Sequence, residues 1–326
     1  MKIVRSSGKA PNEKLFHHLA QKDFSSETEM KKYLNTLIGK NLDDLGGNEG
    51  KTPLDEAQFL IYDAWEEAES KKRLALANKA LEISPDCSDA YNLLAEESAS
   101  SPKEALDLYQ EGVAAGKRVL GEKNFRENKG RFWGMQETRP YMRSLAGKAK
   151  TYFEIGDPDQ GFAIYYEMLD LNPGDNQGIR YELLARHGDR LEFDAMVALL
   201  NRYPNDCEAN WVFTIPLLSF QKEGDSLRSK EQLHFAINHN PRVADYLLGR
   251  KDLPADIPDQ IQLGGDSEAQ AYGVKFLSLW NKVNGALEWL EGQEEIFRQK
   301  KGAGRLNRND PCLCGSGRKQ KKCCGV

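Results

Sequence analysis

The last fifteen residues of this 326-residue chain hold four of its six cysteines, Cys312, Cys314, Cys323 and Cys324. Their spacing is C-x-C, then eight residues that include two glycines, then C-C. Two close pairs of thiols joined by a short turn supply four thiolates for one ion, which is the ligand set of a closed, tetrahedral zinc site. The pattern therefore predicts one structural zinc ion. Because such a site leaves the metal no open position, we expect no catalysis by the metal.

The rest of the composition favours metal binding over disulfides. No run approaches the roughly 18 apolar residues of a membrane span, and the N-terminal residues lack the apolar core of a secretory signal. We therefore expect a cytoplasmic protein without a membrane span. In a reducing compartment, clustered cysteines bind metal rather than pair as disulfides.

The tail resembles the SEC-C motif, the zinc-binding tail of the SecA preprotein-translocase ATPase. The matching residues are Arg308-Asn309-Asp310-Pro311-Cys312, Cys314-Gly315-Ser316-Gly317 and Lys321-Lys322-Cys323-Cys324-Gly325. The family usually has proline where this chain has Leu313, which is not a ligand. The resemblance implies the same four zinc ligands and a docking role, since the SecA tail contacts a chaperone and the ribosome. By resemblance, a chaperone, a translocation component or the ribosome would bind the basic residues of the tail, which are Arg318, Lys319, Lys321 and Lys322.

Charge is distributed unevenly along the chain. The formal net charge is −5, but residues 297–326 hold nine Lys or Arg and one Asp, so that this segment carries +8 and residues 1–296 carry −13. A basic tail on an acidic body suggests an anionic partner for the tail. One alternative is a nucleic-acid or ribosomal RNA contact, whose strength would fall steeply with salt. The other is a solvated tail whose charges serve solubility.

Four prolines in the middle of the chain follow predicted helices. Pro85, Pro173, Pro204 and Pro241 each follow an apolar stretch with helical periodicity, so each marks the end of a predicted helix. The steps between the last three, 31 and 37 residues, are close to the roughly 34 residues of a tetratricopeptide repeat.

The interval 142–173 resembles that repeat most closely. With Met142 as its first position, the small residues Ala149 and Gly161 fall where the two helices of a repeat approach each other. The register is also held over residues 54–87 by Ala57, Ile61, Ala64, Ala77 and Ala80.

These patterns predict an all-α fold, a tetratricopeptide-like solenoid of helical hairpins with a small zinc-stabilised module at its C-terminus. The predicted divisions are residues 1–50, a polar segment with one short helix at 26–40; residues 51–250, the repeats; residues 251–300, a loop and a long capping helix; and residues 301–326, the zinc module. The capping helix, over 269–299, is expected to be broken near Gly285.

A second conspicuous stretch, residues 130–143, interrupts the repeat register and mixes aromatic with charged residues. Together with residues 171–181 it resembles the suppressor-of-tumorigenicity tetratricopeptide family. One interpretation is a ligand groove with arginines as anion anchors and aromatics as hot spots. The other is that Phe132, Trp133 and Tyr141 belong to the core and that Glu137 pairs with Arg139. The candidate groove residues are Trp133, Glu137, Arg139, Tyr141, Arg143 and Arg180.

The remaining candidates for chemistry are weaker. Cys87 and Cys207 each lie just after a repeat proline, where we expect packing residues. The five histidines show no paired-ligand spacing, and the phosphate-binding and nucleophile-elbow motifs are absent from the sequence. We therefore expect a non-catalytic adaptor whose repeats bind a protein or peptide while its tail docks to a second partner. An enzymatic site around Trp133–Arg143 is the remaining alternative.

Overall fold

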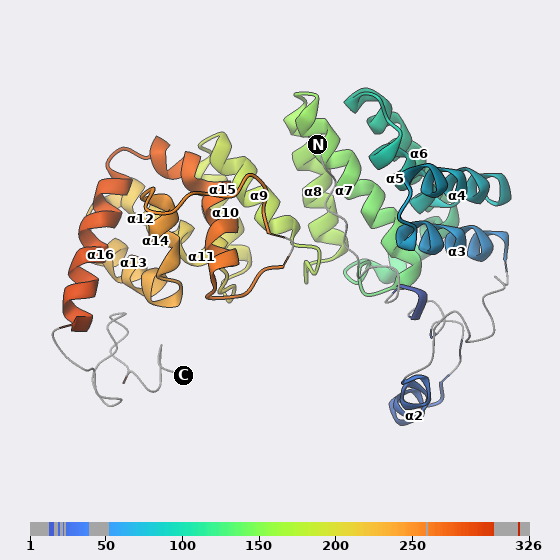
Figure 1. Ribbon diagram of the computed structural model, residues 1–326, viewed down its shortest axis with the longest axis horizontal. Coiled ribbons are helices and arrows are strands. Elements are labelled where there is room, and N and C mark those ends of the chain that lie inside the picture. Colours follow the sequence, from blue (N-terminus) through green and yellow to red (C-terminus); the bar gives the residue numbers. More distant parts are fainter. Residues whose placement is uncertain are drawn as a thin grey trace. The chain divides into compact units, whose positions relative to one another are not determined.

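The computed structural model describes residues 13–15, 19, 22, 24–38, 52–258, 260–302 and 319 of the chain, and the elements of these ranges are helices (Figure 1). The all-α prediction is confirmed at this level. The chain divides into an N-terminal unit, residues 1–179, and a C-terminal unit, residues 180–326. The domain boundaries predicted at residues 50, 250 and 300 stay predictions.

The helices of the N-terminal unit are α2 (Glu27–Leu37), α3 (Pro53–Glu66), α4 (Ser70–Ile83), α5 (Ser88–Glu97), α6 (Pro102–Asn128), the 3₁₀ turn η2 (Gln136–Thr138), α7 (Arg139–Glu154) and α8 (Pro158–Leu171). Those of the C-terminal unit are α9 (Ile179–Asp189), α10 (Phe193–Arg202), α11 (Ala209–Val212), α12 (Thr214–Glu223), α13 (Leu227–His239), α14 (Arg242–Leu247), α15 (Asp266–Lys282) and α16 (Ala286–Gly302).

The predicted proline stops are confirmed. Helices α4, α8, α10 and α13 each end two residues before their proline, because the residue that precedes a proline is disfavoured in the α conformation. Helix starts follow local capping: Thr52 and Asp55 form a reciprocal capping box at α3, and the Ser26 side chain accepts from the Glu29 backbone at α2. The predicted break near Gly285 is also confirmed. Gly285 lies between α15 and α16 with φ +74°, a conformation that favours glycine.

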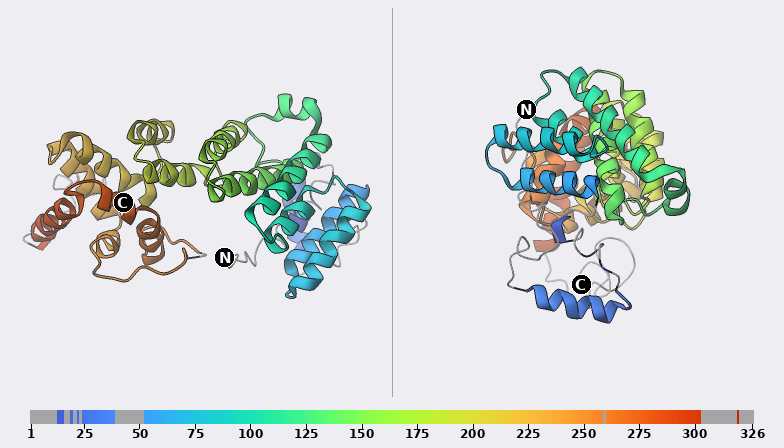
Figure 2. Two further views of the ribbon diagram at one scale, coloured as in Figure 1. Left: turned by 90° about the horizontal axis from the view of Figure 1, so that it is seen from above. Right: turned by 90° about the vertical axis from the view of Figure 1, so that its right-hand side faces the viewer.

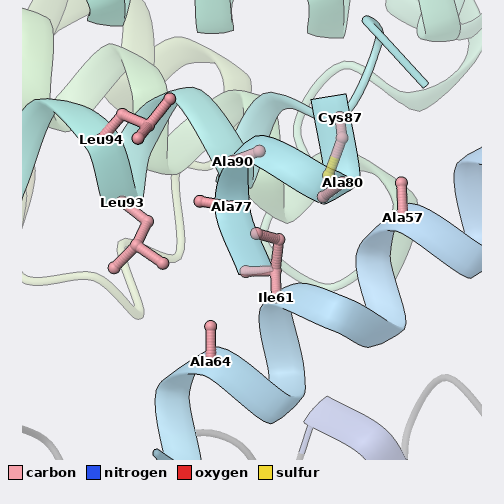
Figure 3. Close-up of a cluster of buried hydrophobic side chains, with 9 residues drawn as sticks. All are labelled: Ala57, Ile61, Ala64, Ala77, Ala80, Cys87, Ala90, Leu93 and Leu94. Carbon is pink, nitrogen blue, oxygen red and sulfur yellow. The ribbon is translucent and has the colours of Figure 1, made fainter. Parts of the chain in front are cut away.

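Consecutive helices of the N-terminal unit fold back on each other as hairpins, α3 with α4, α5 with α6 and α7 with α8 (Figures 1 and 2). Alanines let the first pair approach closely. Nine buried side chains from α3, α4, α5 and the residue that caps α5 form one cluster, shown in Figure 3: Ala57, Ile61, Ala64, Ala77, Ala80, Cys87, Ala90, Leu93 and Leu94. The five residues that hold the repeat register over residues 54–87, which are Ile61 and the four alanines, are all 0% exposed.

The segment between α6 and α7 is held by the end of α8. The backbone carbonyl of Leu171, in the last turn of α8, accepts from the backbone N–H groups of Gly130 and Phe132. A carbonyl that has no partner within its own helix is thereby satisfied. The same contact fixes the position from which α7 begins.

The C-terminal unit has an aromatic core around α11, α12 and α15. Trp211, Phe213, Tyr272, Phe276 and Trp280 are all at most 1% exposed. The Trp280 indole N–H donates to the Tyr272 hydroxyl at 2.9 Å, whereas the Trp211 indole N–H is buried without a hydrogen-bond partner among the described residues. Among the described residues, none of the helices combines the length and the apolar character needed to cross a membrane.

Candidate functional site

Two aromatic residues of the stretch 130–143 belong to the core. Phe132 and Tyr141 are 0% and 1% exposed, and their rings pack on Phe125 of α6 with centroids 5.1 Å and 5.2 Å away. The Tyr141 hydroxyl donates to Glu167 at 3.3 Å, and burial raises the pKa of Tyr141. The prediction of Tyr141 as a hot-spot aromatic is therefore wrong. Its ring is buried between the helices and is inaccessible to a partner.

Arg143 of α7 is the centre of a buried polar network. Its Nε and Nη2 atoms donate to the two carboxylate oxygens of Asp89 on α5, at 2.8 Å and 2.5 Å, and its guanidinium lies 5.2 Å from the ring centroid of Trp65. Asp89 is fully buried and also accepts from Gln58 and Asn92. Burial lowers the pKa of Arg143, but Asp89, Glu13 and Tyr62 together raise it by more, so the pKa lies above its usual value and the residue stays charged.

Arg139 lies beside Arg143 at the start of α7. Its Nε donates to the Trp133 carbonyl at 3.0 Å, and the guanidinium is 5.7 Å from the Trp133 ring, which is half-buried. Its Nη1 lies 3.2 Å from Oε1 of Glu13, and Nη1 of Arg143 lies 3.4 Å from the same oxygen. The carboxylate between the two arginines is thus Glu13, while Glu137 is exposed at the surface.

Sequence reasoning missed Glu13 and its neighbour Lys14, because both fall in a polar stretch that predicts a loop. Each is only 8% exposed. Gln136 of η2 donates to the Glu13 carbonyl at 2.8 Å and also contacts the Tyr62 hydroxyl. The signal available in the sequence was one adjacent acid–base pair, which has no periodicity that could reveal its partners.

Arg180, the third predicted anion anchor, belongs to the C-terminal unit. Its Nε donates to Asp206 at 2.6 Å, and its guanidinium lies 4.2 Å from the ring of Tyr181 and 5.8 Å from that of Trp211. The Tyr181 hydroxyl donates to the same Asp206 oxygen at 2.9 Å. The guanidinium of Arg180 is thus paired with a carboxylate of its own unit. Its role as an anion anchor stays a prediction.

A different surface of the N-terminal unit is hollowed. The hollow has a volume of about 560 Å³ and lies between α4, α5 and α6. Leucines from all three helices line it, namely Leu74, Leu94 and Leu108. The other lining residues are polar or acidic: Asn78, Ser98, Glu104, Asp107, Gln110 and Glu111. An apolar lining beside carboxylates is chemically suited to an apolar side chain flanked by basic residues.

The predicted zinc ligands Cys312, Cys314, Cys323 and Cys324 lie outside the described residues, as do Arg318, Lys321 and Lys322 of the tail; Lys319 is described and is exposed. Within the described ranges, no three His, Cys, Asp or Glu side chains are grouped to hold a metal ion. Four clustered thiols in a C-x-C…C-C pattern nevertheless fit the donor preference of zinc.

The two remaining cysteines differ in their surroundings. Cys87 is fully buried in the cluster of Figure 3, as predicted for a packing residue, and burial raises the pKa of its thiol to about 12. Cys207 is exposed, so the prediction that it is a packing residue is wrong.

Comparison with protein families finds two matches. The family described as ST7 protein matches residues 50–139 and 223–300, and the SEC-C motif matches residues 308–325. The first match covers slightly more than half of the chain and includes both units. The sequence-based resemblances to the suppressor-of-tumorigenicity family and to the SEC-C motif are therefore confirmed.

Individual relatives show the same likeness. A Homo sapiens protein described as suppressor of tumorigenicity 7 protein-like is 28% identical over 257 residues, which is 71% of this chain and 44% of that protein. A Rattus norvegicus protein described as suppressor of tumorigenicity 7 protein is 27% identical over 281 residues, 72% of this chain and 48% of that protein. The chain thus spans about half the length of the curated relatives it matches. No solved structure matches the chain.

Proposed function

This chain belongs to the ST7 protein family, and we propose that it works as a non-catalytic cytoplasmic adaptor. Its helical hairpins bind a protein or peptide, and its SEC-C tail docks to a second partner. Two binding modules on one chain raise the effective concentration of each partner near the other. The hollow between α4, α5 and α6 is the observation that carries the proposal.

The proposal takes the hairpins to be stacked as in a tetratricopeptide solenoid. Support comes from small residues at the close approaches within the predicted repeat. Ala149 of α7 is 0% exposed. A Cβ added to Gly161 of α8 would lie 2.5 Å from the Phe153 ring of α7, so any larger residue would force the ring or the helix to shift. Stacked hairpins present an extended surface to a ligand.

The chemistry of the hollow selects a class of peptide. Asp107 and Glu111, one turn apart on α6, are exposed beside the leucines. Glu104 differs from them, because its carboxylate accepts from the Ser100 backbone and hydroxyl and so belongs to the start of α6. A peptide with two leucines flanked by lysines would bury its leucines on Leu74, Leu94 and Leu108 and pair its lysines with Asp107 and Glu111.

The test is a fluorescence-polarisation titration of the full chain with a labelled peptide that carries two leucines four residues apart, flanked by lysines. We expect the double variant Asp107→Lys/Glu111→Lys to bind about tenfold or more weakly, because like charges now face each other. Glu122→Lys/Glu127→Lys makes the same double change on exposed residues of α6 that do not line the hollow, and it should bind normally. If the two variants bind equally, or the intact chain does not bind, the hollow is not the partner site.

The tail is proposed to hold one structural zinc ion through Cys312, Cys314, Cys323 and Cys324, and to dock through its basic residues to a chaperone, a translocation component or the ribosome. Zinc would supply a crosslink that folds a segment too short to bury a core. Co-sedimentation with ribosomes, comparing the full chain with one ending at Gly304, tests the ribosomal case. Loss of sedimentation without the tail supports it, and equal sedimentation contradicts it.

A second candidate function, binding of ribosomal RNA or another nucleic acid by the tail, is supported by its charge of +8 over residues 297–326. It predicts that the tail-dependent binding falls steeply as salt is raised and is competed by unrelated RNA. Binding that survives moderate salt and RNA competitor supports protein docking instead.

A further inference from the structure

We propose that four residues form a binding site for a helical peptide that carries an adjacent Glu–Lys pair: Arg139, Arg143, Asp63 and Glu66. Residues 13–15 of the chain itself occupy this site and compete with such a peptide. The inference deepens the proposed function, and rests on it in taking the helical hairpins to be a protein-binding surface. It uses none of the residues that line the hollow.

The two arginines of the site recognise a carboxylate. Oε1 of Glu13 lies 3.2 Å from Nη1 of Arg139 and 3.4 Å from Nη1 of Arg143. These partners are more than 120 residues away in sequence. Gln136 binds the Glu13 main-chain carbonyl at 2.8 Å, a contact that any residue could make. The arginines therefore recognise the side chain at the position of Glu13, and Gln136 fixes the path of the backbone there.

The two acidic residues of the site, Asp63 and Glu66, recognise the lysine that follows. Nζ of Lys14 lies 3.0 Å from Asp63 and 2.8 Å from Glu66, which are three residues apart on one face of α3. Lys14 is 8% exposed, whereas Asp63 and Glu66 are 56% and 41% exposed, so the acids are accessible and the lysine is enclosed. The site thus places positive groups beside the first residue of the pair and negative groups beside the second. A peptide with the two charges in reverse order would meet like charges at both positions.

The protein holds the arginines in place without help from Glu13. Asp89 and the Trp65 ring fix Arg143, and the Trp133 carbonyl and ring fix Arg139. With residues 13–15 displaced, these contacts would still hold the two guanidinium groups beside the place that a carboxylate fills, which is the preorganisation that a binding site needs.

The built-in occupant fits imperfectly. In the described part of the chain, Oε2 of Glu13 and Oε1 of Gln136 are buried without a hydrogen-bond partner. A buried acceptor that has lost water and gained no donor costs free energy. A partner peptide whose own carboxylate keeps a donor or a water at its second oxygen, and that leaves a donor or a water for Oε1 of Gln136, would displace residues 13–15 and bind more tightly than they do.

A titration on the full chain tests the proposal. The probe is a labelled peptide with the sequence of residues 8–20, which contains the Glu–Lys pair. In the native chain the tethered copy competes at an effective concentration on the order of millimolar. We expect the double variant Glu13→Ala/Lys14→Ala to bind the probe about tenfold or more tightly than the native chain, because its own segment no longer fills the site.

Two controls separate recognition of the Glu–Lys pair from a structural clasp, meaning a contact that only holds residues 13–15 against the fold. A probe with the order of Glu and Lys reversed should not bind the Glu13→Ala/Lys14→Ala chain. Adding Asp63→Asn/Glu66→Gln, at exposed positions that do not endanger folding, should return the affinity for the original probe to the native value or below. Equal binding of both probes, or no gain in the Glu13→Ala/Lys14→Ala chain, would overturn the proposal and leave residues 13–15 as a structural clasp.

The same chains are titrated with the leucine–lysine peptide of the hollow. Its affinity should not respond to Glu13→Ala/Lys14→Ala. If only the leucine–lysine peptide fails to bind, the hollow is not the partner site and the Glu–Lys site is still supported. If only the residue 8–20 probe fails to bind, the Glu–Lys site is contradicted and the hollow is still supported.

Discussion

Arg143 and Asp89, 54 residues apart in sequence, form a two-pronged ion pair that joins α7 to α5, with Nε–Oδ1 and Nη2–Oδ2 distances of 2.8 Å and 2.5 Å. Asp89 is 0% exposed. Removal of one member of such a pair leaves the other as an uncompensated buried charge, which typically costs about 3–5 kcal/mol. We therefore expect Asp89→Ala to lower the free energy of unfolding of the chain by about this amount, measured by urea titration followed by circular dichroism.

The exposed pair of Arg118 and Asp86 provides the control, since its side chains are 51% and 39% exposed. Solvent screens such a pair, and Asp86→Ala should cost about 0–1 kcal/mol. A cost of Asp89→Ala no greater than that of Asp86→Ala would show that the Arg143–Asp89 pair does not hold α5 and α7 together.

Gly147 on α7 tests the packing of the hairpins. A Cβ at this position would lie 2.1 Å from the Tyr109 ring of α6, so the ring or the helix has to shift. Overpacking of this kind costs about 1–3 kcal/mol, against a gain of about 1 kcal/mol from the higher helix propensity of alanine. We expect Gly147→Ala to lower the thermal midpoint. Gly292→Ala on α16, where a Cβ meets nothing within 4 Å, should raise it slightly or leave it unchanged.

The cysteines Cys87 and Cys207 should differ in reactivity. The thiolate is the reactive form, and burial raises the pKa of Cys87 to about 12, whereas Cys207 is exposed. We expect iodoacetamide at about pH 8 to modify Cys207 in the folded chain and Cys87 only after unfolding, as read by peptide mass spectrometry. Comparable rates at both residues in the folded chain would contradict the burial of Cys87.

Zinc content tests the cysteine tail. The full chain should contain about one zinc per molecule by elemental analysis, and Cys312→Ser or Cys324→Ser should abolish it. Thiolate ligands must be deprotonated, so acidification should release the ion while the helical circular dichroism signal persists. Cys207→Ser is the matched control and should keep its zinc. Full zinc occupancy in Cys312→Ser would show that this thiol is not a ligand.

Local patterns in the sequence determined the helices. A proline constrains the residue before it, a capping side chain reaches only three residues along the chain, and a glycine such as Gly285 breaks a helix where it stands. The ends of α4, α8, α10 and α13, the start of α2 and the break between α15 and α16 follow from these short-range effects. The SEC-C cysteines were also readable, because their spacing is itself the motif.

Only the tertiary structure decided which charges meet. The partners of Arg139 and Arg143 are Glu13 and Asp89, and the partner of Arg180 is Asp206; none of these pairs could be inferred from spacing, because each depends on which helix faces pack together. For the same reason, sequence placed Tyr141 at the surface as readily as in the core, and left Glu13 and Lys14 in a polar loop. Periodicity fixes which side of a helix is apolar. The element that covers that side, and therefore the partner of each polar group beside it, is set by packing over distances that no local pattern encodes.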